Sequence, residues 1–250
     1  MRPVTGEPRF SIGIAVLTWF LSLTAAYVLT FAVLAATGHL GEKASEFPAW
    51  VTPVTVSALW IPVLAGLRIV SNTYGTRRLR DDYGLRFRKV DLLGIPIGVL
   101  SQLVLVELVY WPLRSGLPET FGRKKVEAPA HDLFDRASGS WKIVLILIVV
   151  VGAPLVEELL YRGLILRSLD GRIHDIVALV ISAAWFALAH LQAVQLPGLF
   201  VFGLVLGYCA QRTRRLGMGL FAHAAFNATT VAILLAQIMP TGVLRMAVLR

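Results

Sequence analysis

The sequence is short of charged residues and of cysteine. Only 16% of its 250 residues are Asp, Glu, Lys or Arg, whereas soluble domains carry roughly 25%. The single cysteine, Cys209, excludes an intramolecular disulfide and a metal site built on a pair of cysteines. The shortage of charge argues against a soluble globular domain, and the shortage of cysteine argues against a disulfide-stapled or cysteine-ligated one.

What the chain has instead is apolar sequence, which makes up 56% of its residues and gives a mean hydropathy of +0.71. Several uncharged apolar runs approach the roughly 20 residues that cross a bilayer as a helix. The runs lie at about 11–37, 49–67, 92–106, 143–156, 176–189, 196–211 and 216–239. We therefore predict an all-α, polytopic bundle of about seven to eight transmembrane helices, with no separate soluble domain.

The chain divides into three predicted regions. Residues 1–140 supply the N-terminal transmembrane helices and a long polar loop at 112–140. For that loop, a plain loop and a loop that contains a short interfacial helix are both open. Residues 141–239 form a helical core, and residues 240–250 form a short tail.

The net charge of +9 comes from Lys and Arg residues that cluster between the apolar runs. Such clusters meet anionic headgroups and favour the cytoplasmic side of a membrane, so we exclude nucleic acid as a partner. The two main clusters are Arg77, Arg78, Arg80, Arg86, Arg88 and Lys89, and Arg212, Arg214 and Arg215. Counting spans from these clusters places the N-terminus, with Arg2 and Arg9, in the cytoplasm. The same count places the basic residues at 123–125 outside, which runs against the rule that basic loops lie on the cytoplasmic side. We expect an integral, multi-pass protein of a bacterial cell membrane.

Three charged residues stand at the end of an apolar run, in the stretch "VEELLYRG" at 156–163. An ionisable side chain near mid-membrane costs about 2.5–3.5 kcal/mol by insertion scales, so each one needs a partner or a function. Glu158 and Arg162 are four residues apart and share a helix face, which lets them neutralise each other. Glu157 is turned about 100° away from Glu158 and has no such partner. A buried carboxylate without a partner is suited to act as a general base.

The same spacing of four recurs in "FALAH" at 186–190 and in "HAAFN" at 223–227, and both stretches place a histidine inside an apolar run. His223 and Asn227 would face one space from a single helix, and Phe186 would pack one turn from His190. Because a helix rises about 1.5 Å per residue, the heights of Glu157 and the two histidines allow them to meet. This placement favours one polar site inside the membrane over three unrelated core residues.

Together the three motifs resemble those of the CPBP intramembrane proteases, a family that includes the type II CAAX prenyl endopeptidases. The family's pattern is EExxxR, then FxxxH, then HxxxN or HxxxD. The chain has "EELLYR" at 157–162, "FALAH" at 186–190 and "HAAFN" at 223–227, in that order. The resemblance covers about residues 141–239, and the first 140 residues match only as apolar spans.

The resemblance implies a hydrolase, an intramembrane (metallo)endopeptidase of the CAAX prenyl protease 2-like type. By this likeness, Glu157 and His190 activate a water molecule, and His223 and Asn227 stabilise the oxyanion of the tetrahedral intermediate. The supporting residues that it implies are Glu158, Arg162 and Phe186. The implied partners are the lipid bilayer and a peptide or protein substrate, with or without a prenyl group.

The family name leaves two alternatives for a cofactor. In one, His190 and His223 bind Zn²⁺, which would activate the water directly. In the other there is no cofactor, and the absence of an HExxH motif means that spacing does not favour zinc.

Two other classes of protein compete with a protease. A non-catalytic membrane binding or immunity protein on the same fold would be favoured by a degraded motif, but no motif position is lost here. A secondary transporter would use buried carboxylates and histidines as proton relays. It would also show paired broken helices in two related halves, which the sequence lacks.

Overall fold

The structure is a computed structural model that describes residues 10–43, 46–135, 137 and 139–238. The predicted tail at 240–250 and the N-terminal Arg2 and Arg9 lie outside the described residues. The described residues form helices and no strands, with only an isolated bridge between Asp170 and Ile173. The all-α prediction is confirmed.

The N-terminal part of the chain contains two long helices and then a series of short ones. They are α1 (Ile12–Ala36), α2 (Val51–Tyr74), α3 (Leu79–Asp82), the 3₁₀ helix η2 (Lys89–Leu93), α4 (Gly94–Leu100), the π-helix η3 (Ser101–Leu105), α5 (Val106–Gly116), α6 (Pro118–Phe121) and α7 (Arg123–Asp135).

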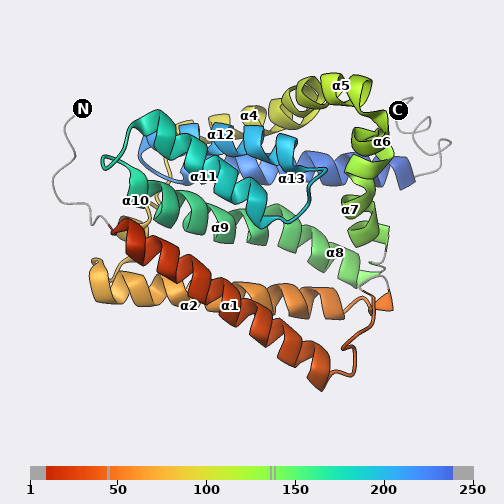
Figure 1. The fold of residues 1–250 in the computed structure, drawn as a ribbon, viewed down its shortest axis with the longest axis horizontal. Helices are drawn as coiled ribbons and strands as arrows, with labels where there is room; N and C mark the ends of the chain where they lie inside the picture. Colours follow the sequence, from red (N-terminus) through yellow and green to blue (C-terminus); the bar gives the residue numbers. More distant parts are fainter. Residues whose placement is uncertain (1–9, 44–45, 136, 138, 239–250) are drawn as a thin grey trace.

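The C-terminal part contains the three motifs. Its helices are α8 (Ser140–Leu147), the π-helix η4 (Ile148–Gly152), α9 (Ala153–Glu157), the π-helix η5 (Glu158–Leu166), α10 (Arg167–Leu169), α11 (Asp175–Ala189), α12 (Leu196–Thr213) and α13 (Gly217–Ile238). The segment α8 to α10 runs between the α1–α2 pair and a layer formed by α4, α11, α12 and α13 (Figure 1).

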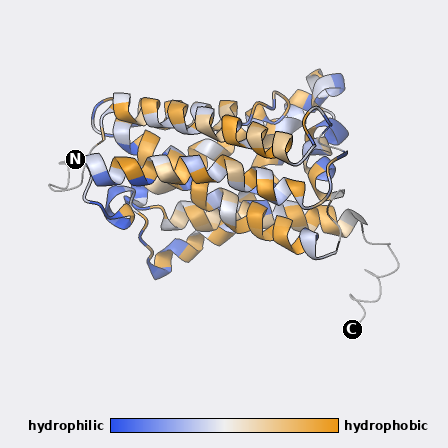
Figure 2. Ribbon diagram, turned by 90° about the horizontal axis from the view of Figure 1, so that it is seen from below, coloured by the Kyte–Doolittle hydropathy of each residue, from blue (hydrophilic) through white to orange (hydrophobic). Residues whose placement is uncertain are grey.

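Five helices are long and apolar enough to cross a membrane. They are Ile12–Ala36, Val51–Tyr74, Lys89–Gly116, Ser140–Leu169 and Gly217–Ala236, and the shorter α11 is also apolar. Apolar residues cover the helices along their length, while hydrophilic residues gather at the two ends of the bundle (Figure 2). A multi-pass membrane protein is therefore confirmed, and the span number of seven to eight stays a prediction.

Helix α1 shows how the chain is built for lipid rather than water. Its large apolar side chains point outward, as at Phe20 and Val28, which are about 60% exposed. Its small residues are the buried ones, and Ser22 lies where a Cβ at Gly66 of α2 would come within 2.2 Å of its hydroxyl. Small residues at contacts between helices are typical of membranes, because lipid supplies no hydrophobic drive and close van der Waals packing must replace it.

Helices α4 and α13 also approach closely through glycine. A Cβ placed on Gly98 would lie 2.0 Å from the carbonyl oxygen of Ala222, and one on Gly94 would lie 2.3 Å from that of Met218. The two glycines therefore set the separation between α4 and the helix that presents His223.

One end of the bundle gathers both basic clusters and the start of α1. The ring of Phe10 lies 5.4 Å from the ring of Tyr83, and the backbone N–H of Leu216 donates to the carbonyl of Gly84 at 2.8 Å. The loops at 75–88 and 213–216 therefore lie on one side of the membrane, as expected if basic loops share the cytoplasmic side. Which side of the membrane that is stays a prediction.

Residues 112–140, the predicted polar loop, are helical over most of their described length, in the end of α5 and in α6 and α7. They lie at the end of the bundle opposite the basic clusters (Figure 1). The side chain of Gln195 donates to the carbonyl of Val126 in α7 at 3.2 Å. Helix α7 thus packs on the loop that directly follows His190.

Candidate active site

The motif "EELLYR" lies where a helix changes its winding. Helix α9 ends at Glu157, and the π-helix η5 begins at Glu158. A second π-helix, η4, precedes α9 and leaves the carbonyl of Val149 to accept a hydrogen bond from the side chain of Asn227. Wider π-helical turns inside α-helices occur frequently at functional sites.

Glu158 and Arg162 form the ion pair that their spacing predicts. The Nη1 atom of Arg162 donates to Oε1 of Glu158 at 2.9 Å, and both side chains are completely buried. The second guanidinium nitrogen donates to the carbonyl of Gly203 at 3.1 Å, and the guanidinium lies 4.4 Å from the centre of the Phe186 ring. Each contact offsets part of the cost of burying the charge. Arg162 thereby joins η5 to α11 and α12.

His223 stands between the two glutamates. Its Nδ1 atom lies 3.1 Å from Oε1 of Glu158, and its Nε2 atom lies 3.7 Å from Oε2 of Glu157. Two aromatic rings meet the imidazole edge-on, Phe186 at 5.9 Å and Phe202 at 5.5 Å between centroids. The ring of His223 is therefore held on several sides within the bundle.

His190 ends helix α11 and lies near the same space. Its Nδ1 atom is 2.8 Å from the carbonyl oxygen of Phe186. Because a carbonyl only accepts, Nδ1 carries a proton, and in the neutral imidazole Nε2 then has a free lone pair. The Phe186 ring packs against His190 at 4.8 Å, one turn away as the motif predicts.

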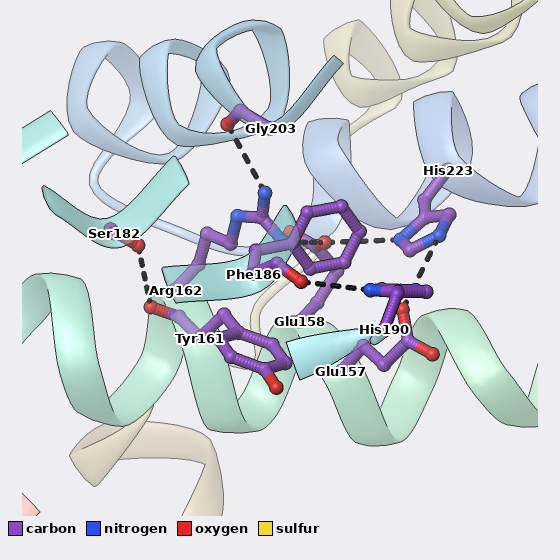
Figure 3. A network of polar contacts seen from close by, with 9 residues as sticks. All are labelled: Glu157, Glu158, Tyr161, Arg162, Ser182, Phe186, His190, Gly203 and His223. Carbon is purple, nitrogen blue, oxygen red and sulfur yellow. Dashed lines mark hydrogen bonds and ion pairs between the residues drawn. The ribbon is translucent and has the colours of Figure 1, made fainter. Parts of the chain in front are cut away.

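The two glutamates differ in their access to solvent or substrate. The side chain of Glu157 is 24% exposed, whereas that of Glu158 is 0% exposed. The side chains of Glu157, His190 and His223 point toward one space (Figure 3). The structure therefore brings these three residues together from α9, the C-terminal end of α11 and α13.

Asn227 is one turn from His223 on α13, and its described contact is with Val149 rather than with the two histidines. The Nδ2 atom of Asn227 donates to the Val149 carbonyl at 2.8 Å. Its second N–H remains for another acceptor. Sequence reasoning did not find the carbonyls of Val149 and Gly203 as parts of this site, since a backbone carbonyl leaves no signal in residue type.

The arrangement does not fit a zinc site. Among the residues that the structure describes, no group of three or more His, Cys, Asp or Glu side chains is arranged to hold a metal ion. Catalytic zinc sites use three protein ligands and one open position. The pair predicted for a metal, His190 and His223, would need Glu157 as a third ligand, and the three do not form such a group.

The comparison with known families agrees with the motifs. Residues 139–229 match the family described as Rce1-like, type II CAAX prenyl endopeptidase Rce1-like. No curated protein and no solved structure is significantly similar to the chain. Residues 139–229 therefore carry an Rce1-like domain, and the residues before 139 lie outside the match.

Proposed function

We propose that the protein is an intramembrane endopeptidase that hydrolyses peptide bonds with a water molecule activated by Glu157 and His190. The family match supports the class of enzyme. The geometry supports the residues, because Glu157 is the partly exposed member of the glutamate pair and faces the same space as both histidines.

In the proposed reaction, the water lies between Glu157 and the free Nε2 lone pair of His190. Glu157 takes a proton from the water, and the oxygen attacks the carbonyl carbon of the peptide bond. When the C–N bond breaks, the proton passes from Glu157 to the leaving amine. This step regenerates the carboxylate, and one water is consumed for each bond that is cut.

His223 and Asn227 are proposed to stabilise the negative oxygen of the tetrahedral intermediate. Asn227 has one N–H left after its bond to Val149. His223 presents Nε2 on the side of Glu157. A donor that is fixed before the reaction, as the Asn227 amide is, needs no reorganisation and is most effective in a site of low dielectric constant.

An apolar cavity of about 560 Å³ lies between α1 and α11. Two of its lining residues, Ala189 and Leu191, flank His190 in the sequence. Trp19 lines the cavity from α1, and its ring meets that of Trp185 edge-on at 5.3 Å. This cavity supports an apolar, membrane-embedded substrate, with or without a prenyl group.

The function is tested by cleavage of quenched peptides, prenylated and unprenylated, with the purified protein in liposomes. We expect cleavage by the wild type and a loss of at least about 100-fold in Glu157→Gln, since general-base catalysis contributes about 10²–10⁴-fold. A zinc chelator should leave the wild-type rate unchanged. Equal rates for the wild type and Glu157→Gln would overturn the proposal.

The competing function is that of a membrane binding or immunity protein on the same fold. It requires no base, so a partner should bind the wild type and Glu157→Gln equally. The partial exposure of Glu157 beside two histidines favours catalysis over this alternative.

A further inference from the structure

Glu158 makes a contact that its ion pair with Arg162 does not require. Its Oε1 atom accepts from Arg162 at 2.9 Å and also lies 3.1 Å from Nδ1 of His223. Arg162 is always charged in proteins, and a buried guanidinium at this distance keeps the carboxylate ionised. An ionised carboxylate only accepts hydrogen bonds, so the proton in this contact belongs to Nδ1 of His223.

The surroundings leave the Glu158 carboxylate and the His223 ring little freedom. The second carboxylate oxygen, Oε2, is buried without a hydrogen-bond partner. It faces Gly219, where a Cβ would lie only 3.0 Å away. On the other side, the edge-on rings of Phe186 and Phe202 enclose the imidazole. The carboxylate thus meets His223 with Oε1 alone, in one orientation.

We propose that Glu158 is a positioning residue for His223, which holds Nδ1–H toward itself and thereby turns Nε2 toward Glu157. The charges of Arg162 and Glu158 cancel, so this ion pair adds no net charge to the interior of the bundle. The other ionisable groups near this contact are Glu157, His190 at the end of α11 and the thiol of Cys209 on α12. The thiol is close enough to Glu158 to interact with its charge.

The catalytic consequence of this inference rests on the proposed function. With Nδ1–H bound to Glu158, a neutral His223 has no proton on the side of Glu157. Nε2 can therefore donate to an oxyanion only by sharing the proton that Glu157 has taken from the water, since Oε2 of Glu157 lies 3.7 Å from Nε2. Glu158 in this way decides which nitrogen of His223 takes part in the reaction.

The first test is independent of cleavage and uses the full-length protein labelled with ¹⁵N-histidine in lipid bilayers. The wild type is compared with His223→Gln, which identifies the His223 signals. We expect Nδ1 of His223 to carry a proton. An unprotonated Nδ1, with the proton on Nε2 only, would overturn the inference.

The second test separates positioning from folding with two double variants. Glu158→Met with Arg162→Met removes both charges and the acceptor for Nδ1–H. Replacing a buried ion pair with apolar residues of similar volume is often neutral or stabilising, so this variant should fold. The matched control, Glu158→Gln with Arg162→Met, also lacks Arg162 but keeps a side-chain oxygen that can accept from His223.

We expect the first double variant to lose Nδ1 protonation at His223 and to lose about 10–100-fold in kcat, as when the hydrogen-bond partner that orients a metal-ligating histidine is removed. Its KM should be little changed. The control should keep the Nδ1 proton and most of the activity. Equal losses in both variants, at equal thermal stability, would show that the pair acts only through packing.

The two proposals can fail separately. If the wild type cuts no peptide but His223 carries its proton on Nδ1 and loses that preference in the first double variant, the proposed function fails and the positioning role stands. If cleavage requires Glu157 but the Nδ1 proton is absent, the positioning role fails alone.

Discussion

Arg215 and Asp91, which are 124 residues apart in the sequence, form a buried ion pair at the basic end of the bundle. The Nε atom of Arg215 lies 2.9 Å from each carboxylate oxygen of Asp91, and Asp91 is completely buried. Asp91 also accepts from the backbone N–H of Arg88 at 2.7 Å. The pair joins the start of the α4 segment to the turn that begins α13, the helix of His223.

Asp91→Asn should therefore destabilise the protein. It leaves Arg215 without its counter-ion, and breaking a buried pair by removing one partner costs about 3–5 kcal/mol. Arg215 is 13% exposed, which places the expected loss at the low end of that range. Thermal unfolding in detergent micelles measures the effect.

The control for Asp91→Asn is Asp81→Asn, which removes an exposed ion pair at the same end. Asp81 lies 2.8 Å from Arg86, and this hydrogen bond and charge lower the pKa of the Asp81 carboxyl. Because solvent screens exposed pairs, Asp81→Asn should leave the unfolding temperature unchanged. Equal effects of the two substitutions would contradict the buried role of Asp91.

Gly98→Ala should separate α4 from α13. The new methyl would lie 2.0 Å from the carbonyl oxygen of Ala222, and neither backbone can yield locally. We expect a large fall in thermal stability and a loss of activity, since α13 presents His223. Gly116→Ala in α5 is the matched control, because a Cβ there meets nothing within 4 Å. A normal Gly98→Ala protein would show that the two helices can shift freely.

Tyr83 should contribute to unfolding at high pH. Burial, and secondarily the charge of Asp82, raise the pKa of its phenol above the ordinary value of 10.0, and its hydroxyl donates to the carbonyl of Leu67 at 2.6 Å. When a group has a higher pKa in the folded protein than in the unfolded chain, it stabilises the fold fully at pH values below the pKa of the unfolded chain. That stabilisation is lost as the pH rises through the pKa of the folded protein.

Tyr83→Phe should accordingly be less stable than the wild type at neutral pH, by about 1 kcal/mol for the lost hydrogen bond. The gap should narrow above pH 10, since Phe cannot ionise. Chemical unfolding at several pH values measures both effects. A gap that stays constant or widens at alkaline pH would contradict the role of the phenol.

Glu157 and Glu158 should respond differently to substitution although they are adjacent. Glu157→Ala, His190→Ala and His223→Ala should each abolish cleavage while the protein still folds and inserts. Glu158→Ala should in addition lower stability by about 3–5 kcal/mol, because it leaves Arg162 buried without its partner. Paired measurements of rate and unfolding temperature distinguish the two outcomes. A folded and active Glu157→Ala protein would refute the proposed reaction.

The sequence predicted the class of fold and the position of the motifs for simple reasons. A bilayer requires every backbone group to be satisfied within the segment, so long apolar runs predict helices. Spacing of four places two residues on one helix face, which predicted the Glu158–Arg162 pair and the packing of Phe186 on His190. These are local relationships, and a single helix suffices to produce them.

The segment at 112–140 shows where local reasoning ended. Its polar composition suggested a loop and left a short helix open, but α7 runs through thirteen residues of it. The side chain of Gln195 donates a hydrogen bond to the carbonyl of Val126, which joins this helix to a loop about seventy residues later in the chain. Composition carries no information about such a partner.

The sequence by itself determined a helical membrane protein with glutamates, histidines and an arginine inside apolar runs, because desolvation makes such residues costly unless they are paired or functional. Only the tertiary structure decided which groups meet. In the folded protein, Nδ1 of His223 contacts Glu158 and Nε2 lies beside Glu157. Arg162 donates a hydrogen bond to the carbonyl of Gly203. Those contacts depend on how α11, α12 and α13 pack against η5, and helix packing is set by side-chain shape across distant segments rather than by the spacing within any one of them.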